Sequence, residues 1–348
     1  MRRFNTIFAV AVLLLTVMSP VHAGNDTLWV DDDGGQCKSA DHTTIQDAID
    51  AAVAGATIRV CAGTYAGATV DKMVNLEAVG HVVIDTGPYS HPGFLVAGFL
   101  FPPDYSGSGS SIRGFHFQGT QQTGGDDGEL DFPIFSRGAN GVAVSHNTMN
   151  DSLQGITNWN GSDWVIDHNT LTDLWTFCGG GIGILAGGFD GGAHGDNEIS
   201  HNEVSGTLHV SSGDCGGYDG TGIVLFADFR SGRAGATSLS GNTIHHNTVE
   251  LVSDTPGVVN VNGFELTDTR DTVPVITGNN LSHNQVPSIG DDGFTVSGAP
   301  GNFFGFNKIG VSGGFDISDD TLGAGTGGTA NTWDKNRCDT SSPGGLCK

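Results

Sequence analysis

Hydrophobic and polar residues alternate in short segments that recur along the chain. One recurring segment has an apolar residue, usually followed by Ser or Asp, then His-Asn, then an apolar residue two positions later. Its copies contain Asn147, Asn169, Asn202, Asn247 and Asn284, and a degenerate copy contains Asn307. Alternation with a period of two predicts β-strands.

A second alternating segment falls between successive copies of the first. It starts at Gly155, Gly181, Gly222, Gly263, Gly293 and Gly314. Short strands separated by Gly, Asn and Asp turns predict a coil that climbs one strand spacing per turn, which is a parallel β-helix. Equivalent residues would then stack about 4.8 Å apart, and each recurring asparagine could bond its copies above and below.

The ends of such a coil expose unpaired strand edges and need caps. Thr44-Ile45-Gln46-Asp47 forms a capping box, and apolar residues keep helical spacing from there to Val53. Gly55 is a natural C-terminal stop. We therefore expect an amphipathic helix over residues 44–54 at the N-terminal end, followed by the first strand over residues 57–60.

All six cysteines lie after residue 23, and an even number indicates disulfides. The spacings favour the pairs Cys37–Cys61 and Cys338–Cys347, which leaves Cys178–Cys215. The loop between the last two cysteines would close a C-terminal cap over residues 331–348. A metal site is the weaker alternative, because no Cys-x-x-Cys occurs.

The N-terminal residues are typical of a targeting sequence. Arg2 and Arg3 precede an apolar run over residues 7–18, and Val21-His22-Ala23 supplies small residues for cleavage. This layout predicts a signal peptide over residues 1–23, and hence a secreted or periplasmic protein. Residues 24–348 would form one β-helix domain. No other apolar run is long enough to span a membrane, so we expect no membrane insertion of the mature chain, and we expect a monomer.

The composition excludes several classes of protein. The 348 residues include 38 Asp and Glu but only 14 Lys and Arg, for a formal net charge of −24. Such acidity argues against nucleic-acid binding, since little here could neutralise a phosphate backbone. A hydrophobic content of 37% argues against a disordered polyanion, and the 56 glycines follow no collagen period.

The opening of the exported part resembles a known group of proteins. The segment from Thr44 to Ala52, followed by Gly63-Thr64-Tyr65, is similar to the start of secreted right-handed parallel β-helix proteins of the pectin-lyase-like superfamily. The Asn-rich repeats resemble NosD-type repeats, and the ending with Trp333, Cys338 and Cys347 also fits. This resemblance implies a right-handed parallel β-helix. It leaves the activity open, because the superfamily includes lyases, hydrolases, epimerases, esterases and non-enzymes.

The catalytic motifs of these families are mostly missing. Of the polygalacturonase pattern, only Gly290-Asp291-Asp292-Gly293 and an imperfect Ala193-His194-Gly195 are present. The Gln-Asp-Thr motif of pectin methylesterases does not follow the similar opening. The site therefore has to be inferred from the repeats themselves.

The spacing of the repeats directs attention to the middle of the chain. The asparagines are 22 and 23 residues apart near the ends but 33, 45 and 37 apart in the centre. Extra residues in a solenoid form side loops that often wall a binding face.

Stacking of the Gly segments predicts two columns on that face. Two positions past the glycine lie Gly183, Val224, Glu265, Thr295 and Asp316. Four positions past it lie Trp159, Leu185, Phe226, Thr267 and Ser297.

A group of carboxylates and arginines would surround these columns. The expected catalytic residues are Asp228, Arg230, Glu265, Asp268 and Arg270, with Asp291 and Asp292 next along the strip. Trp159 and Phe226 are the expected substrate-binding residues, because sugar rings stack on aromatic surfaces. The predicted partner is an extracellular polysaccharide.

This arrangement permits three interpretations. Two carboxylates on adjacent coils could act as acid and base in glycoside hydrolysis. Clustered carboxylates could instead hold Ca²⁺ against an acidic sugar while an arginine removes a proton, as in a lyase or epimerase. The patch could also be a charged ladder in a carbohydrate-binding or cell-surface structural protein. We favour a glycan-cleaving enzyme, acting on a neutral glycan or, with Ca²⁺, on an acidic one.

Histidines offer further candidates. Each copy of the first segment has a histidine before its asparagine: His146, His168, His201, His246 and His283. Such a ladder could ligate Cu or Zn, but a polar residue also suits this bend, and we favour the structural interpretation. His194 and His209 lie outside the ladder and are candidate general acids or bases.

Overall fold

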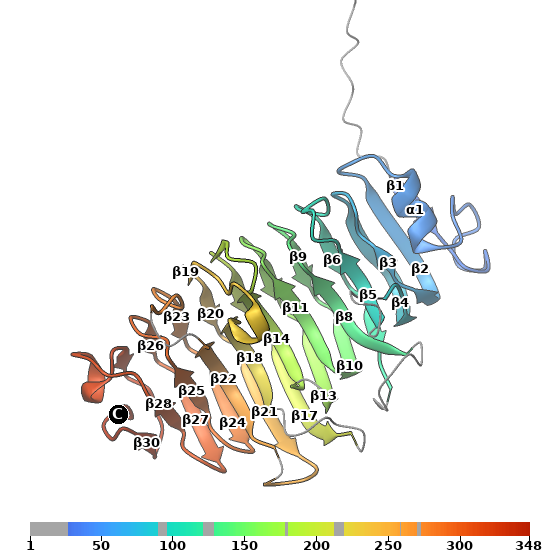
Figure 1. Cartoon of the computed structure of the whole chain (residues 1–348). Coiled ribbons are helices and arrows are strands. Elements are labelled where there is room, and N and C mark those ends of the chain that lie inside the picture. The colour runs from blue at the N-terminus through green and yellow to red at the C-terminus, as the bar shows by residue number, and fades with distance from the viewer. Residues whose placement is uncertain are drawn as a thin grey trace, which may run out of the picture.

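The computed structural model winds into stacked coils that progress along one axis from the N-terminus to the C-terminus (Figure 1). The structure describes residues 27–89, 96–120, 129–177, 180–211, 219–257, 259–269 and 273–348. All pairings between named strands are parallel, and each strand pairs with its equivalents in neighbouring coils. The chain is therefore a right-handed parallel β-helix, as predicted.

The first strands of each coil form an 18-stranded sheet. Its members are β1 (Thr27–Val30), β2 (Thr57–Ala66), β4 (Asn75–Thr86), β6 (Ser111–Arg113), β7 (His116–Gln118), β9 (Ala143–Ser145), β10 (Thr148–Ser152), β12 (Val165–Asp167), β13 (Thr170–Thr176), β16 (Glu198–Ser200), β17 (Glu203–Val210), β20 (Thr243–His245), β21 (Thr248–Ser253), β23 (Asn280–Ser282), β24 (Gln285–Ile289), β26 (Phe303–Gly305), β27 (Lys308–Ser312) and β29 (Thr332–Asp334).

The last long strand of each coil contributes to a 10-stranded sheet, which positions the candidate site. Its members are β3 (Ala68–Thr69), β5 (Val96–Phe101), β8 (Leu130–Ser136), β11 (Gln154–Trp159), β14 (Ile182–Gly188), β18 (Gly220–Ala227), β22 (Val261–Asp268), β25 (Phe294–Ser297), β28 (Ile317–Asp319) and β30 (Ser341–Ser342). A small sheet pairs β15 (Ala193–Gly195) with β19 (Ser238–Ser240).

The core consists of stacked apolar side chains inside the coil. One column contains Ile166, Ile199, Ile244, Leu281, Phe304 and Trp333, all at most 1% exposed. The rings of Phe304 and Trp333 stack with their centroids 3.9 Å apart at the C-terminal end. Residues remote in sequence thus become direct neighbours, as the repeats predicted.

The recurring asparagines form a continuous ladder at the bend between the first two strands of each coil. The side-chain Nδ2 of each donates to Oδ1 of the next over 2.9–3.1 Å. The ladder runs through Asn147, Asn169, Asn202, Asn247, Asn284, Asn307 and Asn336. This confirms the predicted role of the asparagine.

A second asparagine ladder, which we did not predict, runs parallel to the first. Its Nδ2–Oδ1 hydrogen bonds are 2.8–3.0 Å long from Asn197 to Asn302, and the backbone N–H of Asn302 donates to Asn331 over 2.8 Å. The members are Asn197, Asn242, Asn279, Asn302 and Asn331. Each lies five residues before an asparagine of the first ladder, so the signal was present in the sequence.

The N-terminal cap is helical, as predicted, but shorter. Helix α1 (Ile45–Ala51) begins at Thr44, whose side chain accepts a hydrogen bond from the Asp47 N–H over 3.1 Å. Ile45 is buried against the core, whereas Val53 lies beyond the helix and is 54% exposed. Strand β1 precedes the helix and pairs with β2, so the strand that we expected to be first is the second.

Disulfides lie near both ends of the described coil. Cys37–Cys61 and Cys338–Cys347 are both formed, as predicted. Leu346 is fully buried beside the second disulfide, so the C-terminal loop seals the last coil. The predicted pair Cys178–Cys215 and the predicted signal peptide over residues 1–23 lie outside the described residues. Among the described helices, none has the length and apolarity required to cross a membrane.

Candidate active site

The strand register fixes which side chains share the outer face of the 10-stranded sheet. One outward column contains Thr157, Leu185, Val224, Glu265, Thr295 and Ser318. Val224, Glu265 and Thr295 were placed correctly. Gly183 and Asp316 were not: Gly183 lies at the level of Gly222, and Asp316 at the level of Gly293. In these two coils the expected positions were counted from Gly181 and Gly314. Each of these glycines lies two residues before the position that is equivalent to Gly222 and Gly293.

The neighbouring column provides the predicted aromatic surface. Trp159, Gly187, Phe226, Thr267 and Ser297 occupy equivalent positions on successive strands. The rings of Trp159 and Phe226 lie 6.0 Å apart, because Gly187 between them has no side chain. Phe189 packs edge-on against Trp159 at 5.2 Å. Leu185, which we expected here, lies in the adjacent column instead.

Glu265 lies in a hollow of about 330 Å³ on this face, over β14, β18 and β22. The Thr221 hydroxyl donates to one carboxylate oxygen over 2.7 Å, and the Thr267 hydroxyl donates to the other over 2.5 Å. These two bonds fix the orientation of the carboxylate. Phe226 and Arg230 also line the hollow.

Arg230 is held at the edge of the hollow by Asp228. Asp228 is fully buried and accepts hydrogen bonds from the Arg230 backbone N–H over 3.0 Å, from Arg230 Nε over 3.1 Å, and from Arg233. Burial favours a higher pKa for Asp228, but the hydrogen bonds and positive charges of the two arginines bring its pKa below the usual range. The Arg230 guanidinium then lies 4.9 Å from the centre of the Phe226 ring. Asp228 therefore positions Arg230 and does not itself face the hollow.

The structure does not bring Asp268 together with Glu265. Asp268 lies three residues further along β22, so alternation directs it to the other side of the strand. It pairs in register with the core residue Ala227, is 6% exposed, and accepts a hydrogen bond from the Val275 N–H over 2.8 Å. Arg270, the remaining predicted site residue of this loop, lies outside the described residues.

Asp291 and Asp292 supply carboxyl groups just before β25. Burial raises the pKa of Asp291, and the negative charges of Asp292 and Asp219 raise it further. Burial also raises the pKa of Asp292, although hydrogen bonds from the Phe315 N–H (2.6 Å) and the Ser318 hydroxyl oppose this shift. Ser318 belongs to the same outward column as Glu265, two strands away. These groups therefore border the Glu265 column.

Asp219 is a site residue that the sequence analysis missed. It lines the Glu265 hollow, and its Oδ1 accepts a hydrogen bond from the Asn260 N–H over 3.2 Å. Asp219 directly precedes β18, just as Asp291 and Asp292 precede β25. An aspartate shortly before an outward-facing strand was the signal available in the sequence.

The two loop histidines lie outside this hollow. His194 Nε2 is 2.7 Å from Asp190 Oδ1, and His194 lines a separate hollow of about 390 Å³ with Tyr105. His209 Nδ1 is 3.0 Å from Asp254, and its ring stacks on Trp175 at 4.6 Å. Neither residue is placed beside Glu265.

Among the described residues, close groups of metal-binding atoms occur elsewhere. Two of them contain histidine: Asp167 with His168 and His201, and Asp151 with Asp173 and His209. None contains Glu265, Asp291 or Asp292. The described site therefore offers no preformed cluster for the Ca²⁺ considered above.

Comparison with known proteins gave structural similarities. No family model and no curated protein matched the sequence. The pectin methylesterase from Aspergillus niger aligns over 84% of this chain and 87% of its own, with 15% identity and a TM-score of 0.48. A pectin methylesterase variant in complex with a hexasaccharide covers 82% and 90%, with 10% identity and a TM-score of 0.48. The catalytic domain of a GH87 alpha-1,3-glucanase covers 82% and 61%, with 14% identity and a TM-score of 0.35.

Proposed function

We propose that this chain is an exported enzyme that hydrolyses a polysaccharide on the outer face of β14, β18, β22 and β25. One observation carries the proposal: Glu265, oriented by two hydroxyls, shares a hollow with Phe226, and the neighbouring strand is preceded by Asp291 and Asp292, whose pKa values are raised. Glycosidases likewise use two carboxyl groups, one as general acid and the other as base or nucleophile. The four strands lie side by side in the middle of the molecule (Figure 1).

The aromatic side of the hollow suits a sugar ring. Phe226 and Trp159 present ring faces and edges beside the hollow, and sugars bind to such surfaces through their C–H groups. The Arg230 guanidinium and the threonine hydroxyls around Glu265 can bond sugar hydroxyls. An open face that continues from coil to coil suits a long polymer.

The carboxyl groups can supply the reaction. We assign Asp292 as the general acid that protonates the glycosidic oxygen, because its raised pKa keeps it protonated at higher pH than an ordinary aspartate. Glu265 is assigned as the carboxylate that activates the attacking water. The C–O bond breaks, the leaving sugar takes the proton from Asp292, the water oxygen bonds to the anomeric carbon, and Glu265 takes the proton that the water loses.

The same geometry gives less support to lyase or epimerase chemistry. That mechanism would need Arg230 to lose a proton and take one from the sugar. Arg230 Nε donates to the buried Asp228 carboxylate over 3.1 Å, so the guanidinium is already engaged in an ion pair. The net charge of −24 also repels polyuronates at low salt, so we propose a neutral glycan as substrate.

Export is part of the proposal. Two disulfides are formed in the described residues, which is typical of proteins that fold in an oxidising compartment. The signal-peptide pattern over residues 1–23 agrees with this. A polysaccharide outside the cytoplasm is then the accessible substrate.

A panel of polysaccharides tests the activity and the assignment together. We expect the wild-type chain to release reducing ends without unsaturated products, and Glu265→Gln and Asp292→Asn each to lower kcat by at least about a hundredfold. Glu250→Gln is the matched control, because Glu250 is an exposed residue of the other sheet. Wild-type kcat in Glu265→Gln would refute the assignment, and unsaturated products would indicate a lyase.

The second candidate function is carbohydrate binding without cleavage. It is favoured by one observation: both oxygens of Glu265 already accept hydrogen bonds from threonines, as in a static binding surface. If no polysaccharide is cleaved but wild-type migration in glycan-containing gels is retarded, and Phe226→Ala abolishes that retardation, this function replaces the first.

A further inference from the structure

The histidine ladder forms a column of stacked rings on the corner where each coil bends. Neighbouring rings lie 4.8–5.2 Å apart and within 7–13° of parallel. Every member has a positive φ of 53–58°, a left-handed conformation that histidine tolerates better than most residues. The members are His146, His168, His201, His246 and His283. The left-handed conformation of the bend is therefore compatible with a histidine at each of these positions.

The stack itself does not require imidazole. Phe306 continues the column 5.0 Å from His283, and Lys335 takes the next position with its ammonium 4.9 Å from the Phe306 ring. Both have the same positive φ, 58° and 55°. A phenyl ring therefore fulfils the structural role, and the ring nitrogens of the histidines remain to be explained.

Two of these histidines share one carboxylate. Asp167 Oδ2 lies 2.6 Å from His168 Nδ1, and Asp167 Oδ1 lies 3.2 Å from His201 Nδ1. The Ser200 hydroxyl donates to Asp167 Oδ1 over 2.9 Å and fixes its orientation. The ligand atoms of the three residues all lie within 4.8 Å of one another.

Asp167 is the one carboxylate in its column between β9 and β23. The equivalent positions hold Ser145, Ser200, His245 and Ser282. His146 and His283 therefore have the same backbone and the same stacking as His168 and His201, but no aspartate at the adjacent position. The carboxylate of Asp167 therefore sets His168 and His201 apart from the other histidines of the ladder.

We propose that Asp167, His168 and His201 bind a divalent transition-metal ion of the Zn²⁺ type. Two imidazoles and one carboxylate are a common ligand set for such ions. The side chains of His168, His201 and Asp167 are 52%, 45% and 27% exposed, so an ion can enter and keep water on its open positions. The metal would replace the protons that the two Nδ1 atoms now share with Asp167.

The geometry needs only side-chain movement. Zinc–ligand distances of about 2.0–2.2 Å separate ligand atoms by roughly 3–3.5 Å. The ligand atoms here lie within 4.8 Å of one another, so the stacked rings of His168 and His201 would tilt toward each other to share an ion. The net charge of −24 raises the local concentration of cations. His245 lies on the same corner with its ring perpendicular to His201, but its Nδ1 pairs with His246 Nδ1 over 2.9 Å and its Nε2 with Glu198 over 3.3 Å.

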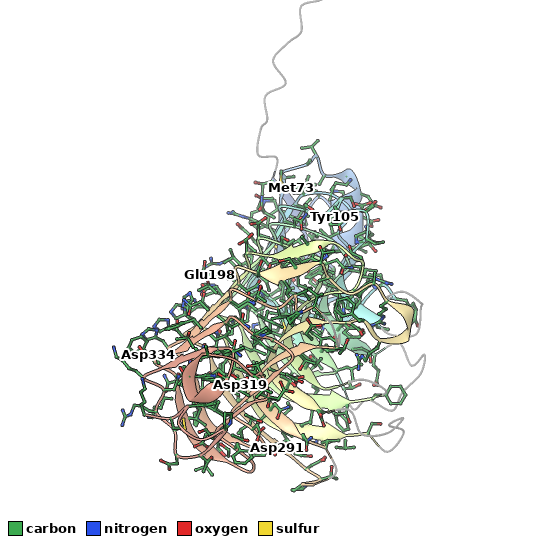
Figure 2. The ribbon with its side chains drawn as sticks, turned by 60° about the vertical axis from the view of Figure 1, so that its left-hand side comes forward. Met73, Tyr105, Glu198, Asp291, Asp319 and Asp334 are labelled. Carbon is green, nitrogen blue, oxygen red and sulfur yellow. A yellow bond between two sulfur atoms is a disulfide. The ribbon has the colours of Figure 1, made fainter. Side chains whose placement is uncertain are left out.

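This site is separate from the proposed active site. Nitrogen-bearing side chains line the edge between Glu198 and Asp334, whereas Asp291 lies at a different corner of the coil (Figure 2). His168 and His201 belong to the bends of the 18-stranded sheet, and Glu265 to the outer face of the 10-stranded sheet. The inference therefore stands whether or not the chain cleaves glycans.

Calorimetric titration of the full chain with Zn²⁺ at neutral pH tests the proposal. We expect one ion to bind to the wild type, and His168→Phe, His201→Phe and Asp167→Asn each to weaken binding at least about tenfold. His146→Phe and His283→Phe are the matched controls, and we expect them to change the affinity less than about twofold. Equal losses in controls and target variants, or no loss in any target variant, would overturn the proposal.

A second measurement keeps the test decisive if a variant fails to fold. Electron paramagnetic resonance of the wild-type chain with one equivalent of Cu²⁺ counts the coordinating nitrogens directly. We expect two imidazole nitrogens with oxygen ligands in the remaining positions. Absence of nitrogen coupling, or a set of four nitrogens, would contradict the assigned ligands.

Discussion

Replacing Asn247 by alanine removes one rung from the first asparagine ladder and tests what holds the coils in register. Asn247 is fully buried. Its Nδ2 donates to Asn284 Oδ1 (3.1 Å), Ile199 O (2.8 Å) and His245 O (3.1 Å). Its Oδ1 accepts from the backbone N–H (2.9 Å) and Nδ2 (3.0 Å) of Asn202. The substitution removes these five bonds: the Asn202 N–H loses its acceptor, whereas Asn284 Oδ1 still accepts from the Asn247 N–H (3.0 Å) and Asn202 Nδ2 still donates to Ile166 O (2.9 Å).

The magnitude follows from those five hydrogen bonds. An intramolecular hydrogen bond contributes about 1 kcal/mol net, and a buried group left unpaired loses at least that much. Because several partners keep another hydrogen bond, we expect Asn247→Ala to lower the free energy of unfolding by about 3 kcal/mol. A loss of this size is a large part of the stability of an ordinary domain.

Urea unfolding followed by circular dichroism measures the change, and Asn280→Ala is the matched control. Asn280 lies in the neighbouring coil but is exposed, so its loss should change the free energy of unfolding by less than about 0.5 kcal/mol. A destabilisation below about 1 kcal/mol for Asn247→Ala would refute the view that the ladder holds the bends. Equal effects of the two substitutions would refute it as well.

Three further predictions follow from the described contacts. Because the pKa of Asp292 is raised in the folded chain, its stabilising contribution is present below the unfolded value of 3.8 and is lost as pH rises through the folded value. Asp292→Asn should therefore raise Tm at neutral pH but not in acid, and an equal gain at every pH would contradict this. Phe226→Ala should raise KM about fivefold with little change in kcat, measured by reducing-end release, whereas a change confined to kcat would exclude a binding role. Replacing Cys37 and Cys61 by alanine opens a loop of 24 residues and should lower stability by about 3 kcal/mol in urea unfolding; no change would show that the loop is held by other contacts.

The fold could be predicted because each repeated position in the sequence has a single structural role. An asparagine at every bend, an alternating strand and a helix with a capping box each have few structural solutions, and all three occur as expected. The second asparagine ladder shows that the sequence contained a further signal of the fold. Asn242 precedes Asn247 by five residues, just as Asn279 precedes Asn284, but no histidine precedes the asparagines of this second ladder.

The register of individual columns was harder to predict, because turns absorb residues without changing the strands. Val224 and Glu265 were placed correctly side by side, because Gly263 is a single glycine and the second glycine of Gly220-Thr221-Gly222 was the one counted. Where two glycines alternate, as at Gly181 and Gly183, spacing alone does not identify the equivalent one. The result displaced Leu185 by one column.

The site could be predicted only in part, because burial and long-range pairing decide the role of a charged residue. Glu265 and Asp268 differ by an odd number of positions, so strand alternation alone already separates them. The double ion pair of Asp228 with Arg230 and Arg233 depends on how the loop folds back. The raised pKa of Asp291 arises from burial and from Asp219, a residue 72 positions earlier in the chain.

The most direct test of a glycan site on the 10-stranded sheet is a crystal structure of Glu265→Gln with an oligosaccharide of the polymer that the wild type cleaves. The account predicts a sugar ring against Phe226 and a glycosidic oxygen within hydrogen-bond distance of Asp292. An oligosaccharide bound on the 18-stranded sheet, or at the hollow beside His194, would contradict it.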